Sequence, residues 1–179
     1  EIVHHATGQA VARVSQANSG LIVRDVHRMD DTVLERFTVA DLIGKCRKAA
    51  DLFMSATLPL GDTSQSFDDY VGQLSATTGM PIAYCRSNAE KIRRVLAEMD
   101  VIVGGLTRGF DLTILDRGYG SSSHEGTKPR SHEEGTTRST REPQTLSFFR
   151  EGCIFGAVLP SNSPGVHGLW IPAVALKTP

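Results

Sequence analysis

Long apolar runs and a surplus of charge of one sign are both missing from this sequence. No stretch approaches the roughly 20 apolar residues of a membrane-spanning helix, and the first residues do not have the pattern of a signal peptide. The 19 Lys and Arg residues nearly balance the 20 Asp and Glu residues, which leaves a net charge of −1. Charge therefore gives no reason to expect nucleic acid or a membrane as a partner.

Cysteine is scarce as well. The three cysteines, Cys46, Cys85 and Cys153, have no CxxC spacing, so neither a metal site nor a redox pair is expected. Unpaired cysteines are typical of a reducing compartment, which favours the cytoplasm. Cys46 lies on the apolar stripe of a predicted helix, where a free cysteine acts as a small hydrophobe. Cys153 is the best placed of the three as a nucleophile, but it stands at the wrong end of its predicted strand.

The sequence also lacks the common metal and phosphate motifs. Its six histidines show no H-E-x-x-H or comparable ligand spacing, so no metal is expected. Gly104-Gly105 and Gly118-x-Gly120 do not stand between a strand and the next helix, as a dinucleotide-binding glycine loop requires. Any dinucleotide would have to be bound without that glycine loop.

A chain of 179 residues is long enough for one domain with a hydrophobic core. Three amphipathic helices are predicted, over residues 38–53, 66–78 and 87–106. Thr38 and Ser66 are predicted N-caps, and Ser87-x-x-Glu90 matches a capping box. Gly79 is well placed to end the second helix. Their apolar stripes are expected to form the core.

The remaining elements are shorter or irregular. Residues 3–14 predict a strand or hairpin edge, and residues 21–26 are compatible with a strand or with the start of a helix. Residues 112–115 and 146–149 are predicted strands. Residues 117–145 are rich in Ser, Thr, Gly and mixed charge, a composition that favours either a solvated loop or an extended arm.

The C-terminal stretch predicts a strand, a tight loop and a helix. Residues 153–159 form an apolar run typical of a buried strand, and Pro160 ends it because proline has no backbone donor. Residues 166–177 predict a buried helix that is either kinked at Pro172 or starts afresh at Ile171. Ligands in open α/β sheets bind at the carboxyl ends of strands. The intervening loop, with Asn162, is therefore placed for chemistry, although the same residue types are ordinary turn formers.

The stretch VLPSNSPGVHGLWIPAVAL (residues 158–176) resembles the aldehyde dehydrogenase superfamily, in which a P-x-N-x-P loop joins the first nucleotide-domain strand to an apolar helix. The opening stretch TGQAVARVS (residues 7–15) resembles the start of many members. The resemblance implies an α/β fold with three parts. Residues 1–116 would form an N-terminal, mainly helical part, residues 117–145 a polar loop or oligomerisation arm, and residues 146–179 the first strand-loop-helix of a Rossmann-like nucleotide-binding domain.

The resemblance also implies roles for individual residues. Asn162 would donate its amide to the oxyanion, and Leu159, Pro160 and Ser161 would lie beside NAD or NADP. The parent enzyme would oxidise an aldehyde through a Cys thioester to an acid or an acyl-CoA, as a cytoplasmic homo-oligomer. Ser161 and Ser163 stand where many members carry aromatic residues, which points toward the branch that handles acyl-CoA.

The family's nucleophilic Cys and general-base Glu have no counterpart in these residues. The chain is therefore expected to be the N-terminal portion of a longer product and to be inactive alone. An alternative of another class is a non-catalytic fragment that serves as a structural or interaction module in a larger assembly.

Overall fold

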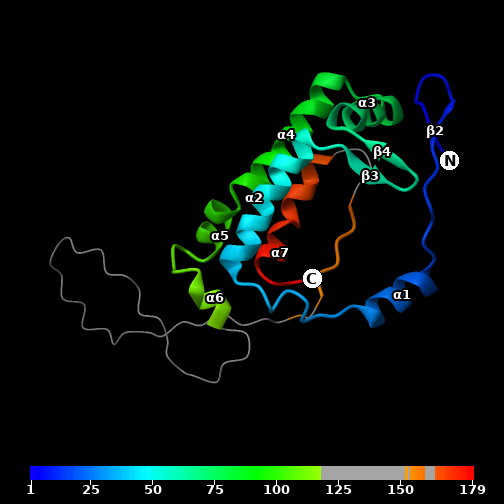
Figure 1. Cartoon of the computed structure of the whole chain (residues 1–179). Coiled ribbons are helices and arrows are strands. Elements are labelled where there is room, and N and C mark those ends of the chain that lie inside the picture. The colour runs from blue at the N-terminus through cyan, green and yellow to red at the C-terminus, as the bar shows by residue number, and fades with distance from the viewer. Residues whose placement is uncertain (118–151, 153, 160–163) are drawn as a thin grey trace, which may run out of the picture.

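The computed structural model describes residues 1–117, 152, 154–159 and 164–179. These residues form a mixed α/β structure that is mostly helical, with two small antiparallel sheets (Figure 1). The α/β class is thus confirmed in its general form. No helix in the described part of the chain is long and apolar enough to cross a membrane.

A layer of helices forms the body of the molecule. Helix α2 (Val39–Ser55) runs along α4 (Ile82–Ala97), and α3 (Phe67–Thr78) and α5 (Met99–Leu106) pack at the two ends of this pair (Figure 1). The core contains apolar residues from these helices and from two short ones that follow: Val39, Ile43, Cys46, Ile92, Met99, Val103, Ile114, Leu115, Ile171 and Ala175.

The predicted starts of α2 and α3 are confirmed. Thr38 and Asp41 form a reciprocal capping box, in which each side chain accepts the other's backbone N–H, and Ser66 does the same with Asp69. The hydrogen bond from the Thr38 hydroxyl holds the pKa of Asp41 below its ordinary value. Gly79, at φ 77°, ends α3 in the left-handed conformation that glycine adopts without strain.

The predicted third helix is wrong at its start and in its middle. Helix α4 begins at Ile82, directly after Pro81, whose carbonyl accepts the N–H groups of Tyr84 and Cys85. Proline suits this position because its fixed φ fits a helix start and its missing N–H is not needed there. Ser87 therefore lies inside the helix, where it caps nothing. Glu98, at φ −101° and ψ 26°, separates α4 from α5.

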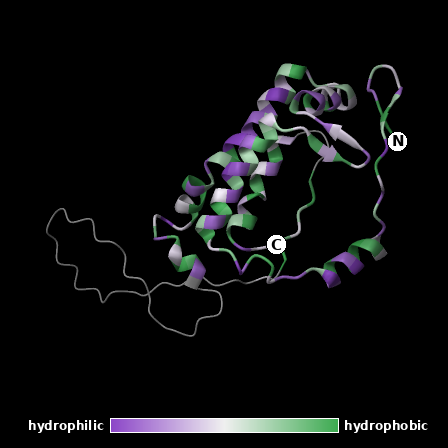
Figure 2. Cartoon of the chain, in the orientation of Figure 1, coloured by the Kyte–Doolittle hydropathy of each residue, from purple (hydrophilic) through white to green (hydrophobic). Residues whose placement is uncertain are grey.

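The N-terminal region forms a hairpin and a separate helix. Strands β1 (Ile2–Val3) and β2 (Ala10–Ala12) pair antiparallel, as the hairpin prediction requires. The helical alternative for residues 21–26 is the correct one, because α1 (Ser19–Arg28) spans them and is capped by Asn18. No residue of α1 is buried, and Figure 2 shows the helix, which carries both hydrophobic and hydrophilic residues, apart from the helical body.

Two further differences concern short segments. Strands β3 (Leu58–Leu60) and β4 (Thr63–Gln65) form a second hairpin between two of the predicted helices, a region for which the sequence predicted no strand. The strand predicted at residues 112–115 is wrong, because helix α6 (Thr113–Arg117) occupies this position. The Asp111 side chain accepts the N–H of Thr113 at 2.9 Å and so starts a turn. Four residues are too few for their periodicity to reveal this.

The C-terminal prediction is correct only in part. The single helix over residues 166–177 is wrong: the 3₁₀ helix η1 (Pro164–Leu169) is followed by a separate α7 (Pro172–Ala175). Pro172 occupies the first turn of α7, so the helix starts afresh at Ile171. The strand predicted over residues 146–149 and nearly all of the polar stretch over residues 117–145 lie outside the described residues.

A partly buried ion pair joins the C-terminal residues to the helical body. The Asp116 carboxylate oxygen Oδ1 lies 2.6 Å from Lys177 Nζ and accepts the backbone N–H of Val39 at 2.9 Å. The Lys177 side chain is only 4% exposed. Its backbone adopts a left-handed φ of 58°, a conformation that lysine rarely takes. Asp116 therefore links α6, the start of α2 and the residues after α7.

We predict that Asp116→Ala lowers the free energy of unfolding by about 2–3 kcal/mol, because it removes the acceptor of two hydrogen bonds, one of them from a charged donor. Urea unfolding measures the change. Asp25→Ala is the matched control, since it breaks the exposed ion pair with Arg24 and should change stability by less than about 0.5 kcal/mol. Equal effects of the two variants would contradict the linking role of Asp116.

We also predict opposite outcomes for two serines. Ser66→Ala should lower stability by about 1 kcal/mol, because it removes the cap of α3. Ser87→Ala should leave stability unchanged or raise it slightly, because Ser87 lies inside α4 and alanine has the higher helix propensity. Thermal unfolding followed by circular dichroism compares the two variants. A loss of stability in Ser87→Ala as large as that in Ser66→Ala would show that Ser87 has a capping role after all.

Candidate functional site

The candidate site is the loop that the sequence places between an extended segment and a helix. Leu159 is the last described residue before this loop, and its side chain is half-buried. Asn162, Pro160 and Ser161 lie outside the described residues. Pro164, the first described residue after the loop, is buried. The geometry of the site is therefore defined by its two flanks.

The flank before the loop differs from the prediction. Residues 154–159 are extended but pair with no strand of the described chain, so the buried strand predicted over residues 153–159 is wrong for these positions. Phe155 is 49% exposed and Val158 is fully exposed. An apolar run predicts burial only where a neighbouring strand covers it, and no described strand lies beside this one.

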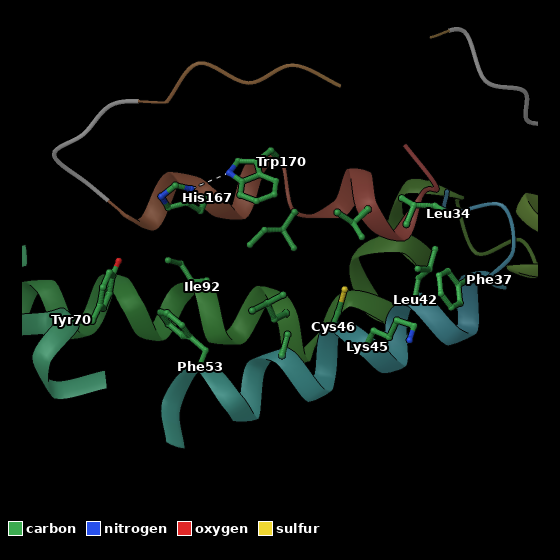
Figure 3. A pocket seen from close by; sticks show the side chains of 14 residues that line it. Leu34, Phe37, Leu42, Lys45, Cys46, Phe53, Tyr70, Ile92, His167 and Trp170 are labelled. Carbon is green, nitrogen blue, oxygen red and sulfur yellow. Dashed lines mark hydrogen bonds between the residues drawn. The ribbon is translucent and has the colours of Figure 1, made fainter. Parts of the chain in front are cut away.

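The flank after the loop is held firmly against the helical body. Helix η1 packs on α4 so closely that a β-carbon added to Gly168 would lie 3.0 Å from Val95 Cγ2. Trp170 Nε1 donates a hydrogen bond of 3.0 Å to His167 Nδ1 (Figure 3). Because Nδ1 accepts this bond, the proton of the neutral imidazole lies on Nε2. Gly168 thus allows η1 to pack closely on α4, whereas the hydrogen bond is local and orders the end of η1 itself.

After η1 and α7, the chain comes back beside the start of the extended segment. The backbone N–H of Phe155 donates to the carbonyl oxygen of Pro179 at 2.8 Å. In Figure 1 the extended segment leads to η1 at one end of the layer, and η1 and α7 then run back to the other end. In the described residues, the extended segment is followed by the helical η1–α7 return, whose end makes a backbone contact with the start of the segment. A β-α-β crossover begins in the same way.

The described cysteines are poor nucleophiles. Cys46 and Cys85 are both buried, and burial raises the pKa of each thiol. Both remain protonated at neutral pH, whereas the thiolate is the reactive form. This agrees with the interpretation of Cys46 as a core residue. Within the described ranges, no group of three or more His, Cys, Asp or Glu residues is arranged to hold a metal ion.

A cavity of about 680 Å³ is the feature that sequence reasoning missed. It lies between α2, α4 and the η1–α7 return (Figure 3), and most of its wall is apolar. Ala49 of α2 contributes only a methyl group to this wall. The apolar stripes of α2 and α4 gave no sign of the space, because a periodic pattern identifies a buried face but not how completely the opposite element fills it.

No protein family, curated protein or solved structure matches the chain. The assignment of the site therefore depends on the residues of this chain and on the geometry of the two flanks.

We predict that Cys46 and Cys85 are protected from alkylation in the folded chain. Iodoacetamide should label both far more slowly at neutral pH than in urea, because burial blocks access and disfavours the thiolate. Peptide mass spectrometry measures labelling of each cysteine separately. Raising the pH toward the elevated pKa values should speed the reaction. Labelling of either cysteine as fast in the folded as in the unfolded chain would identify it as a reactive thiol.

Proposed function

We propose that this chain is the N-terminal part of an NAD(P)-dependent enzyme of the aldehyde dehydrogenase superfamily. The observation that carries the proposal is the hydrogen bond between Phe155 and Pro179, which brings the chain back beside the extended segment after one helical crossing. This is the connection expected of a nucleotide-binding half. In the sequence, the P-x-N-x-P motif (residues 160–164) follows the extended segment directly and ends at the first residue of η1.

In this proposal Asn162 is the oxyanion donor. A fixed neutral amide stabilises a developing alkoxide without reorganisation during the reaction. Leu159, Pro160 and Ser161 lie beside NAD or NADP, which accepts a hydride when bound. The half-buried apolar side chain of Leu159 suits contact with a flat ring of such a dinucleotide. The polar residues Ser161 and Ser163 favour a substrate larger and more polar than a simple aldehyde, such as an acyl-CoA.

The rest of the parent enzyme supplies the nucleophilic Cys and the general-base Glu. The raised pKa values of the Cys46 and Cys85 thiols support a nucleophile elsewhere in the parent enzyme, because a protonated thiol does not form a thioester readily. We assign no metal to the reaction. A cytoplasmic homo-oligomer remains part of the proposal.

A second candidate is an interaction module without catalysis. Helix α1 favours it, because this helix has no buried residue and carries a row of exposed apolar side chains: Leu21, Ile22, Val23, Val26 and Met29. A surface of this kind is typical of a contact with another protein or another part of an assembly.

We predict that the complete reading frame containing this chain reduces NAD or NADP in the presence of an aldehyde. Asn162→Ala in that enzyme should lower kcat by about 10²–10³-fold, because one oxyanion donor is lost. The KM for the cofactor should stay unchanged. Ser163→Ala, in the same loop, is the control and should keep most of the activity. Initial rates at 340 nm over a panel of aldehydes, with and without coenzyme A, distinguish the acid-forming from the acylating reaction.

Two results would argue against the enzyme and for the interaction module. The first is a reading frame with no downstream Cys and Glu in the expected roles. The second is full activity in Asn162→Ala, which would remove the assigned role of the loop.

A further inference from the structure

We propose that the cavity between α2, α4 and the η1–α7 return binds a medium-chain carboxylate, with its alkyl chain inside and its anionic group at Lys45. This inference is independent of the proposed function, because it involves none of the loop residues. It depends on the shape of the cavity, on its lining and on the charges at one end.

The lining suits an alkyl chain. The walls are formed mainly by apolar side chains, among them Leu42, Phe53, Ile92, Leu96, Ile171 and Val174. The volume of about 680 Å³ lies within the range of ligand-binding cavities. Apolar cavities bind apolar ligands because such a ligand leaves water without losing hydrogen bonds. An alkyl chain meets this condition along its whole length.

The shape suits an elongated ligand. In Figure 3, Phe53 and Tyr70 lie at one end of the cavity, and Phe37 and Lys45 at the other. Lys45 and Phe53 are both on α2, and the helical rise places them about 12 Å apart along its axis. This separation corresponds to an extended medium-length alkyl chain with its head at one end, rather than to a compact ring system.

The charges fix the direction of the ligand. Lys45 Nζ lies 4.6 Å from the centroid of the Phe37 ring, and the Arg36 guanidinium lies 4.9 Å from the same centroid. Neither cation forms an ion pair with a described residue. Lys45 and Phe37 line the cavity, whereas Arg36 lies beside the same ring without lining it. Two cations near one apolar opening attract an anion, and a carboxylate there would be partly shielded from water.

The nearest acid on α2, Asp41, attracts Lys45 electrostatically, but it makes its hydrogen bonds elsewhere. Asp41 is one helical turn before Lys45, but the backbone N–H and the hydroxyl of Thr38 both donate to its carboxylate. Asp41 therefore serves the cap of α2. The opposite end of the cavity is lined by Phe53 and Tyr70, with the hydrogen-bonded pair His167 and Trp170 above them. Lys45 is the only Lys or Arg in the described lining. The opposite end therefore suits the methyl terminus of the ligand.

Trp170 provides a direct readout, because it lines the cavity and is the single tryptophan of the chain. The purified chain is titrated with dodecanoate and, in parallel, with uncharged dodecanol, both below their micellar concentrations. We expect a saturable change in tryptophan emission with dodecanoate and a weaker response to dodecanol. Butyrate, which has the charge without the long chain, should give no saturable change.

Variants of α2 separate the charge from the cavity. Lys45→Gln should weaken dodecanoate binding about fivefold and leave dodecanol binding unchanged, as expected for a partly exposed ion pair. Lys48→Gln is the matched control, because Lys48 is exposed on the same helix and does not line the cavity. Ala49→Phe should fill the space and abolish binding of both compounds. An unchanged thermal unfolding curve shows that Ala49→Phe still folds.

Three outcomes would overturn the proposal. One is the absence of a saturable emission change with dodecanoate. Another is equal binding of dodecanoate by the unaltered chain and by Lys45→Gln, which would remove the role of the cation. The third is a dimer in sedimentation that Ala49→Phe converts to a monomer while dodecanoate does not bind, which would assign the cavity to self-association.

Discussion

The Asp116 carboxylate is the contact on which the arrangement of the C-terminal residues depends. It accepts hydrogen bonds from Val39 at the start of α2 and from Lys177 after α7, and so joins three separate parts of the chain. Partial burial strengthens these charge-assisted bonds relative to exposed ones. The ion pair holds Lys177, which follows α7, near the start of α2, in addition to the apolar packing of Ile171 and Ala175 in the core.

The helical layer serves as a base for two different features. On one side, η1 approaches α4 at Gly168 and fixes the residue that follows the P-x-N-x-P loop. On the same helical layer, α7 covers the space above α2 only in part, and a cavity remains between α2, α4 and the η1–α7 return. A loop that acts on a substrate needs a rigid neighbour, which the close packing of η1 on α4 provides. A space that binds an alkyl chain needs incomplete packing, which the partial cover of α2 by α7 provides. The close contact belongs to η1, and the break before Pro172 separates it from α7.

The sequence predicted those features that depend on a few neighbouring residues. The capping boxes at Thr38 and Ser66 and the end of α3 at Gly79 are local, and the structure confirms them. The start of α4 was missed because Pro81 and Ser87 both fit a helix start, and only packing decides between them. The extended residues 154–159 were predicted as a buried strand because an apolar run does not show whether a partner strand is present. The cavity had no local signal at all. The loop residues Pro160, Ser161 and Asn162 remain a prediction from resemblance.

The distance in sequence between Val39, Asp116 and Lys177 also bears on the order of folding. Helices α2, α4 and α5 contact one another over shorter separations than Val39 and Asp116, which are 77 positions apart. Closing a long loop costs conformational entropy before its contacts form, and such contacts slow folding. The helical layer is therefore expected to assemble first. The η1–α7 return then docks late, on a surface that already exists, so the cavity is open during much of folding and its apolar walls are exposed to solvent for that time.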